Sequence, residues 1–470
     1  MVQTYLEAGQ TIAGFHLEAR VHKGGMASLW RVTRPGETAP MLLKAPFIGE
    51  GSDPAAIVSF EMEQAILPRL TGPHVPRFVA AGSFDTQPHL VMEEIPGTSL
   101  YPRLPDLPLP YEEVARIGHA IALALDDVHR QHVVHHDIKP SNIMFRPTGE
   151  AVLLDFGLAF HEQLPDLLQE EFRVPYGTAP YMAPERLNNV RNDPRSDFFS
   201  LGVLLYFFAT AVRPFGEGER LSSMRQRLWR DPHPPRRLRP DLPPWLQEII
   251  LRCLDIDPAW RYGSAALLAF DLAHPDEVKL TARSEKLRRD PLSAVIRRRF
   301  NPERTTPTEA APVTAQLDNA PLVLVAIDLS GSSPTIDAEL QIAARRLLAT
   351  LPGARLACLS VLKLARIAID TTLDDEGRNK HVELLARLRH WSAPLAATAG
   401  GQVSYHVIEA VDPAKAILDF AAANKVAHVL LGARQSSLRK SLLGSVSAEV
   451  AAHAGCSVTI VRPRDYGEEK

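Results

Sequence analysis

The sequence is poor in cysteine and has no long uncharged apolar run. Its three cysteines, Cys253, Cys358 and Cys456, are too few and too widely spaced for a disulfide framework or a cysteine metal site, which indicates a reducing compartment. No run of about 18 uncharged apolar residues is present. The N-terminus also lacks a basic segment followed by an apolar one. We therefore expect a soluble, cytoplasmic protein that does not span a membrane.

The sequence also lacks an excess of charge of either sign. The 52 Lys and Arg residues against 55 Asp and Glu give a formal net charge of -3, so composition predicts no general affinity for nucleic acid. With 470 residues, of which 45% are hydrophobic, the chain is long enough for two or three domains with cores of their own. Disordered and fibrous classes are excluded.

One change in composition divides the chain. Nine Lys and Arg residues stand against three acids between Lys279 and Arg304, and a Thr/Pro/Ala-rich stretch without apolar periodicity follows. Such composition is typical of a linker. We therefore predict one domain at 1–275, a linker at 276–319 and a second domain at 320–465.

Three motifs in the first part share a characteristic order: "HHDIKPSNIMF" (135–145), "LLDFGLA" (153–159) and "GTAPYMAPE" (177–185). In this order and spacing they resemble the protein-kinase catalytic core. The chain is similar to bacterial members of the eukaryote-like (Hanks-type) Ser/Thr protein kinase family. This resemblance implies a bilobal α+β kinase fold, ATP-dependent transfer of the γ-phosphate to Ser/Thr hydroxyls of proteins, and Mg²⁺ or Mn²⁺ as the metal.

The resemblance assigns catalytic roles to residues of these motifs. Asp137 orients the attacking hydroxyl and accepts its proton, and Lys139 neutralises charge on the transferred phosphate. Asn142 and Asp155 are the expected metal ligands. A lysine two residues after the catalytic Asp is typical of Ser/Thr kinases, so these residues predict the acceptor class as well as the reaction.

The resemblance places the ATP contacts nearer the N-terminus. "ARVHKGGMASLWRV" lies where the family has a Gly-rich hairpin over the phosphates, so Gly24 and Gly25 are expected there. "HLVMEEIPGTSL" resembles the segment that contacts adenine, with Met92 at the back of the pocket and Glu93 and Ile95 following it.

Lys44 ends the short apolar run "PMLLKAP". An inward-facing lysine needs an anionic partner because an unpaired buried ammonium is very costly. The α- and β-phosphates and a helical glutamate would supply that partner. "SFEMEQAILPRL" has the periodicity of a helix. Its second acid falls where the family's helix has the ion-pair glutamate, so the resemblance implies Glu63 as the partner, with Glu61 as the fallback.

The activation segment departs from the family. His136 stands where most members have an arginine that pairs with a phosphorylated residue of this segment. Between Leu158 and Gly177 there is no Ser or Thr, whereas several acids are present. We therefore predict a segment whose order does not depend on its own phosphorylation.

Two further resemblances concern the framework of the kinase part. Glu185 is expected to form a buried ion pair with the distant Arg261. Asp197, at the start of a strongly apolar helix, is expected to cap the backbone of the catalytic loop. Outside the folded parts, Thr305, Thr306 and Thr308 are candidate autophosphorylation sites near arginines.

From residue 320 onward, apolar strands alternate with helices, which predicts an α/β doubly wound (Rossmann-like) domain. This part resembles the universal stress protein family. In its ATP-binding members an Asp contacts adenine or ribose and a glycine loop wraps the phosphates, which here implies Asp328 and Gly432, Gly444 and Ser445. Gln435 replaces the middle glycine, and the loop is one residue short.

Two interpretations of the second domain therefore stay open. It binds nucleotide, or it serves packing and homodimerisation through its last strand, 457–462. For the whole chain, the alternatives to a kinase are an ATP-binding pseudokinase scaffold, suggested by His22 and Ala27 at usual glycine positions, and a small-molecule phosphotransferase. The protein substrate is not readable from the sequence.

Overall fold

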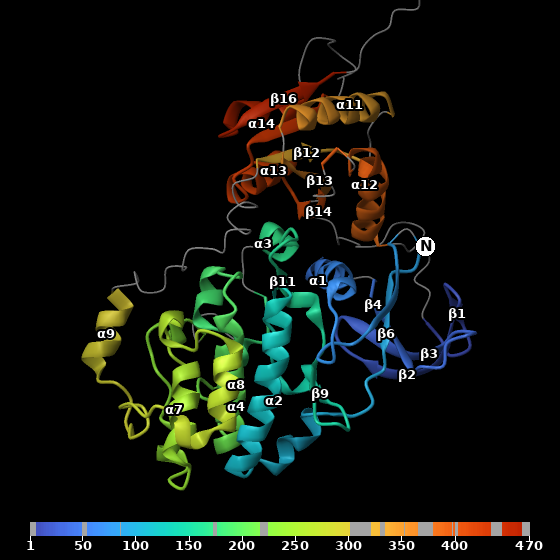
Figure 1. Cartoon of the computed structure of the whole chain (residues 1–470). Coiled ribbons are helices and arrows are strands. Elements are labelled where there is room, and N and C mark those ends of the chain that lie inside the picture. Colours follow the sequence, from blue (N-terminus) through green and yellow to red (C-terminus); the bar gives the residue numbers. More distant parts are fainter. Residues whose placement is uncertain are drawn as a thin grey trace, which may run out of the picture.

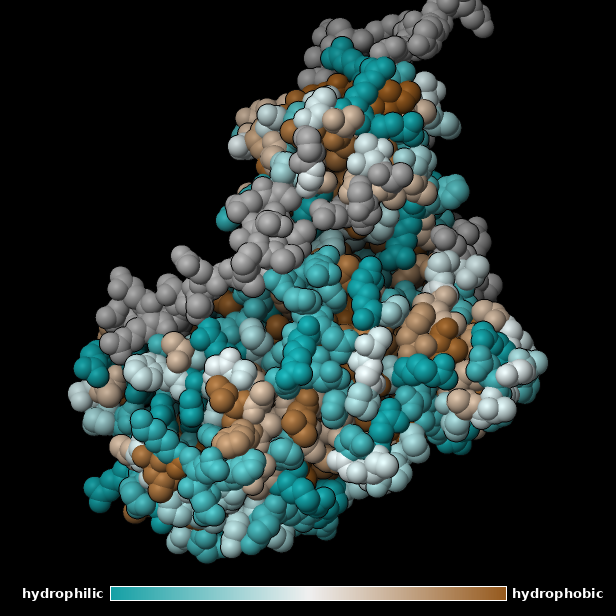
Figure 2. Space-filling model, viewed as in Figure 1, coloured by the Kyte–Doolittle hydropathy of each residue, from teal (hydrophilic) through white to brown (hydrophobic). Residues whose placement is uncertain are grey.

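The structure is a computed structural model in which the kinase-like part lies below the C-terminal domain (Figure 1). The residues described are 6–48, 54–84, 86–172, 176–216, 224–300, 321–329, 334–351, 353–364, 379–396, 398–399, 403–433 and 444–462. Hydrophilic residues cover most of the visible face of both parts, with hydrophobic ones in small groups (Figure 2).

A twisted antiparallel sheet forms the N-terminal lobe, with strand order β1-β2-β3-β4-β6-β5. Residues at alternating positions along these strands, among them Leu17, Trp30 and Leu43, face inward and make a compact core. Helix α1 (Pro54–Ile66) follows β4 in the chain. The strands are β1 (Thr11–Ile12), β2 (Phe15–Lys23), β3 (Ala27–Thr33), β4 (Met41–Pro46), β5 (Phe78–Gly82) and β6 (His89–Glu93).

The second lobe is mostly helical and is built around α4 (Arg195–Thr210). Thirteen residues of α4 are buried, as expected for a helix that is apolar on all sides. The other main helices are α2 (Tyr111–Arg130), α6 (Pro235–Leu238), α7 (Pro244–Cys253) and α8 (Ala265–Ala273). Together, the two lobes confirm the predicted bilobal kinase fold.

Short elements between the lobes carry the catalytic motifs. The first two motifs follow short strands of a two-stranded and a three-stranded sheet, whereas "GTAPYMAPE" lies on the 3-10 helices η5 (Ala179–Tyr181) and η6 (Pro184–Asn188). The other short elements are β7 (Thr98–Ser99), β8 (Val133–Val134), the 3-10 helix η3 (Pro140–Asn142), β9 (Ile143–Phe145), β10 (Ala151–Leu153), the 3-10 helix η4 (Phe156–Leu158), β11 (Phe160–His161) and α3 (Leu167–Glu171).

Part of the predicted linker packs on the kinase part. The Gln247 side chain of α7 donates to the backbone carbonyls of Arg283, Ser284 and Lys286 at 2.8–3.0 Å. Helix α9 covers Leu292–Phe300, and 301–320, including the candidate phosphorylation sites, lie outside the described residues.

The C-terminal domain contains a five-stranded parallel sheet of order β14-β13-β12-β15-β16, which confirms the predicted doubly wound architecture. All five residues of the central strand β12 are buried, as in a sheet covered on both faces. The Asp412 side chain caps α13 by accepting from the amides of Ala414 and Lys415. The strands are β12 (Leu322–Ala326), β13 (Arg355–Lys363), β14 (Val403–Ala410), β15 (His428–Gly432) and β16 (Ser457–Val461), and the helices are α11 (Pro334–Thr350), α12 (Lys380–Ala396), α13 (Pro413–Ala423) and α14 (Ser445–His453).

The two parts pack against each other. One cluster of buried hydrophobic side chains includes residues of the helical lobe and of the C-terminal sheet, such as Leu168 of α3 and Val407 of β14. In Figure 1, α1 and α3 lie directly beneath β14 and α12. Among the described residues, no helix has the length and apolar character needed to cross a membrane.

Candidate active site

Lys44 joins three elements of the site. It lies on β4, and its Nζ is 2.5 Å from Glu63 Oε2 on α1 and 2.9 Å from Asp155 Oδ1 after β10. Glu63 is therefore the glutamate that the structure places against Lys44. Glu61, the fallback, pairs with a residue of the C-terminal domain instead.

Electrostatics keep Lys44 and Asp155 charged. Burial opposes the charge on Lys44, but Asp155 and Glu63 outweigh burial and raise its pKa. Burial likewise opposes ionisation of Asp155, and the neighbouring Lys44 outweighs it, so the pKa of that carboxyl is lowered. Lys44 and Asp155 are therefore a cation and an anion in direct contact.

The catalytic loop forms a closed polar network around Asp137. The Thr178 hydroxyl donates to Asp137 Oδ1 at 2.7 Å, and Lys139 Nζ donates to the Thr178 hydroxyl at 3.1 Å. Lys139 Nζ also lies 2.6 Å from Asp137 Oδ2. Asn142 donates to Asp137 Oδ2 at 2.8 Å, so the loop and the "GTAPY" segment orient one carboxylate together.

Asp197 holds the backbone of that loop. Its two carboxylate oxygens accept from the amides of His135 and His136 at 2.8 Å each, and His129 Nε2 lies 2.9 Å away. His136 has a φ of 65°, which is strained for a residue with a side chain. The predicted capping role is confirmed, because both amides next to Asp137 are fixed by one buried carboxylate.

Asn142 and Asp155 carry side-chain oxygen atoms of the kind that bind a divalent cation. Both supply hard oxygen atoms, and 44% of the Asp155 side chain is exposed, which leaves it accessible to a cation. No group of three or more His, Cys, Asp or Glu side chains suited to a metal occurs in the described part of the chain.

The expected nucleotide contacts lie on or next to strands that pair with β4, the strand of Lys44. Gly24 and Gly25 fall in the turn between β2 and β3, with the Gly24 amide donating to the Ala27 carbonyl at 2.9 Å. Met92 and Ile95 are buried at and after the end of β6. Both residues lie at the hinge, where the chain passes from the N-terminal sheet to the second lobe.

Glu93 is tied to the second lobe at this hinge. Its carboxylate accepts from Arg146 at 2.6 and 3.1 Å, and this bond lowers the pKa of Glu93. Its side chain thus braces the hinge, while its backbone borders the cleft.

The activation segment has its own charged anchor near His136. His136 Nε2 lies 2.6 Å from the Arg191 carbonyl, and burial lowers the pKa of His136 well below its usual value, so the ring is neutral. Arg191 pairs with Asp166 and donates to the carbonyls of Leu158 and Ala159. A carboxylate of the segment itself therefore pairs with an arginine beside this histidine.

The predicted pair between Glu185 and Arg261 is confirmed. Arg261 donates to both carboxylate oxygens of Glu185 at 2.6 and 2.8 Å, and its side chain is fully buried. It also donates to the carbonyl of Arg195 at 2.8 Å. The pair joins the "APE" motif to the helical lobe.

In the C-terminal domain, Asp328 and Gly432 lie at the carboxyl edge of neighbouring strands. Ala326 of β12 pairs with Leu431 of β15, so the two positions follow directly from that register. Gly444 and Ser445 begin α14. Gln435 lies outside the described residues, as do 434–443, so the middle of the expected loop is not placed.

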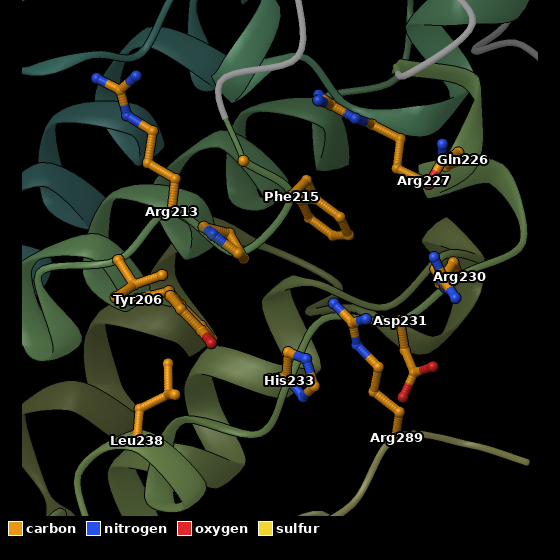
Figure 3. A pocket seen from close by; sticks show the side chains of 13 residues that line it. Tyr206, Arg213, Phe215, Gln226, Arg227, Arg230, Asp231, His233, Leu238 and Arg289 are labelled. Carbon is orange, nitrogen blue, oxygen red and sulfur yellow. The ribbon is translucent and has the colours of Figure 1, made fainter.

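A cavity of about 240 Å³ is lined by residues at and after the C-terminal end of α4 (Figure 3). Four arginines and one acid are among its lining residues: Arg213, Arg227, Arg230, Arg289 and Asp231. Arg289 reaches toward His233 and Asp231 (Figure 3). Arg227, in contrast, donates to the carbonyls of Ala179 and Met182, so it supports the segment that follows Thr178.

Residues 23–272 match the family model "Protein kinase domain", which covers more than half of the chain. The chain belongs to the protein kinase family. Residues 322–462 of this kinase-family chain match the model "Universal stress protein family".

Curated relatives resemble this kinase-family chain over its first part. Serine/threonine-protein kinase pkn3 of Myxococcus xanthus is 31% identical over 61% of this chain and 55% of its own length. PknL of Mycobacterium bovis is 30% identical over 57% of this chain and 67% of its own length. The chain thus spans only about half of the length of pkn3. The crystal structure of the Mycobacterium tuberculosis PknI kinase domain is 26% identical, covers 57% of this chain and 99% of its own, and has a TM-score of 0.46.

Proposed function

We propose that this protein is a serine/threonine protein kinase that transfers the ATP γ-phosphate to hydroxyl groups of protein substrates. The observation that carries the proposal is the network of Asp137, Lys139 and Thr178, which presents one oriented carboxylate beside a lysine. The neighbouring cation, Lys44, is held by Glu63 and Asp155. Kinases need both arrangements for activity.

The step balances with these residues. The substrate hydroxyl oxygen forms a bond to the γ-phosphorus, the bond from that phosphorus to the β,γ-bridging oxygen breaks, and ADP leaves. Asp137 accepts the hydroxyl proton, and Lys139 offsets charge on the transferred group. Bound Mg²⁺ or Mn²⁺ would neutralise phosphate charge, with Asn142 and Asp155 as its protein ligands.

The alternative is a pseudokinase scaffold that binds ATP without transferring phosphate. The turn at Gly24 and Gly25 lacks two of the usual glycines, which favours this alternative. Against it, Lys44, Asp137 and Asn142 are all present and in contact with their expected neighbours. A small-molecule phosphotransferase would not need the segment that carries Thr178.

The test is phosphate transfer from labelled ATP with Mg²⁺ by the full chain, using autophosphorylation and a generic protein acceptor. Replacing a catalytic base costs about 10²–10⁴-fold in rate, so we expect Asp137→Asn to lose label to that extent. Asp241→Asn, at an exposed surface pair, is the matched control and should retain full transfer.

Binding of a fluorescent ATP analogue separates the two readings. Label on the wild type and on Asp241→Asn, but not on Asp137→Asn, supports the kinase. Absence of label on all three proteins, with analogue binding retained, would refute it and favour the scaffold.

For the C-terminal domain we propose two roles for separate tests. The carboxyl edge near Asp328 lies between β12 and β15, where the strand order reverses and α/β domains bind ligands, which supports a nucleotide site. The edge strand β16 pairs with β15 alone within its sheet, which supports homodimerisation through 457–462. We also infer a cytoplasmic location.

A further inference from the structure

The C-terminal domain contacts the two kinase elements whose positions decide activity. Helix α3 belongs to the activation segment, and α1 carries Glu63, the partner of Lys44. Figure 1 shows both helices at the boundary between the two parts. Contacts at this boundary therefore act on the active site through short paths.

Two acids of the activation segment are inserted into the C-terminal domain. Glu170 Oε2 lies 3.0 Å from His406 Nε2, and Glu171 Oε1 lies 3.0 Å from His406 Nδ1. Arg355 also pairs with Glu170. Asn424 donates to the backbone carbonyl of Glu170 at 3.3 Å. Both carboxylates are more than nine-tenths buried, so their partners across the boundary are needed to offset the cost of desolvation.

The second contact is on α1. Arg389 of α12 pairs with Glu61, whose side chain is only 2% exposed. The Arg389 guanidinium also lies 5.3 Å from the ring centres of both Phe84 and Tyr405, one on each side of the boundary.

Glu61 and Glu63 hold α1 from two sides. Residues two apart on an α-helix point about 200° apart, because each residue adds about 100° of rotation. Glu63 therefore faces Lys44 while Glu61 faces Arg389. A helix fixed on opposite faces cannot rotate away from the cleft without breaking one of these pairs.

We propose that the C-terminal domain is an intramolecular activator, in which Arg389, His406 and Arg355 are positioning residues that hold α1 and α3 in the catalytic arrangement. This inference rests on the proposed kinase function and names how that function is controlled. The domain does the work that a phosphorylated activation segment does in kinases that need one.

Three observations favour activation over inhibition. The pair between Lys44 and Glu63, which active kinases require, is formed while the domain is docked. Residues 159–176 contain no Ser or Thr, so the segment has no phosphate acceptor of that kind before Gly177. His136 is neutral, buried and bonded to a carbonyl, and therefore offers no cation to a phosphate.

The test compares the full-length wild type with Arg389→Ala, which breaks the α1 contact, and Glu170→Gln, which weakens the α3 contact from the kinase side. Arg387→Ala is the matched control, since Arg387 is an exposed arginine on the same helix as Arg389. Readouts are kcat, the KM for ATP, and hydrogen exchange in peptides covering α1 and α3. Arg389→Lys tests rescue by a conservative change.

Coupling between sites is commonly about 5–150-fold, so we expect each of the two variants to lower kcat at least about fivefold and to speed exchange in the helix it contacts. Arg387→Ala should match the wild type, and Arg389→Lys should recover part of the loss. Unchanged or increased kcat in Arg389→Ala and Glu170→Gln would overturn the proposal, an increase marking the domain as an inhibitor.

The exchange data keep this inference separate from the proposed function. If the wild type transfers no phosphate, the kinase proposal fails. Faster hydrogen exchange of α1 in Arg389→Ala and of α3 in Glu170→Gln would then still support the inference that the C-terminal domain holds these helices. Unchanged exchange in both variants would refute that inference.

Discussion

Replacing Asp197 tests whether one buried carboxylate maintains the catalytic loop. Its side chain is fully buried and accepts from the amides of His135 and His136. In Asp197→Ala both amides lose their acceptor. In Asp197→Asn one of them faces an amide nitrogen that cannot accept.

The magnitude follows from these contacts. A buried donor left without a partner costs about 1–3 kcal/mol, so Asp197→Ala should cost about 2–6 kcal/mol and Asp197→Asn about half as much. His136 has a strained backbone, with a φ of 65°, so the catalytic loop should also change conformation once the two amides lose their acceptor. For a unit of this size about 1 kcal/mol shifts Tm by roughly 2–4 °C. We expect Tm of the kinase part to fall by roughly 5–20 °C in Asp197→Ala.

Two assays read this out on the full chain. Thermal unfolding gives the change in Tm, and labelled-ATP transfer below the new Tm gives kcat. Asp241→Ala is the matched control, because its side chain is 68% exposed and an exposed pair contributes little. If Asp197→Ala unfolds within about 2 °C of the control and retains its kcat, the carboxylate does not maintain the loop.

Two other predictions concern charge pairs. Arg261→Ala leaves Glu185 buried without its partner and should lower the free energy of unfolding by about 3–5 kcal/mol, measured by urea unfolding with tryptophan fluorescence. Arg116→Ala, at a side chain that is 73% exposed, should lower it by less than about 1 kcal/mol, and equal effects of the two variants would contradict the prediction. Burial opposes the charge on His406, but the carboxylates of Glu170 and Glu171 beside it outweigh burial and raise its pKa from 6.5 to about 9. The stability that the imidazolium contributes is therefore complete below pH 6.5 and is lost as pH rises through about 9. The Tm gap between the wild type and His406→Gln should therefore narrow between pH 6.5 and pH 9.5, and a constant gap would refute it.

Much of the kinase part could be predicted because its motifs contain the residues that carry out the chemistry. Asp137, Lys139 and Asn142 fall within one short stretch, so their proximity follows from chain connectivity alone. The pairs of Glu185 with Arg261 and of Asp197 with the loop amides span long sequence distances, and a resemblance was needed to predict them. The choice of Glu63 over Glu61 likewise needed the resemblance, and nothing in the sequence indicated that Glu61 contacts the C-terminal domain.

The contacts between the two parts were beyond reach for a physical reason. The acids of the activation segment are evident in the sequence, but composition does not show whether such acids face solvent or form buried ion pairs. Arg389 lies on α12, and nothing in the sequence of that helix predicted a contact with the kinase part. His406 lies inside β14, where a single histidine does not predict an ion pair. Only the packing of two separate domains decides which charges meet.

The charges at this boundary explain why a histidine is placed there. Glu61, Glu170 and Glu171 bring three carboxylates, and Arg355 and Arg389 supply two permanent cations. The formal charges of these groups balance when His406 carries a proton, and an unbalanced buried charge is expensive. His406 is fully buried between Glu170 and Glu171, and burial alone would favour its neutral form; the carboxylates reverse that preference. We therefore expect protonation of His406 to favour docking of the C-terminal domain, and with it the order of α1 and α3.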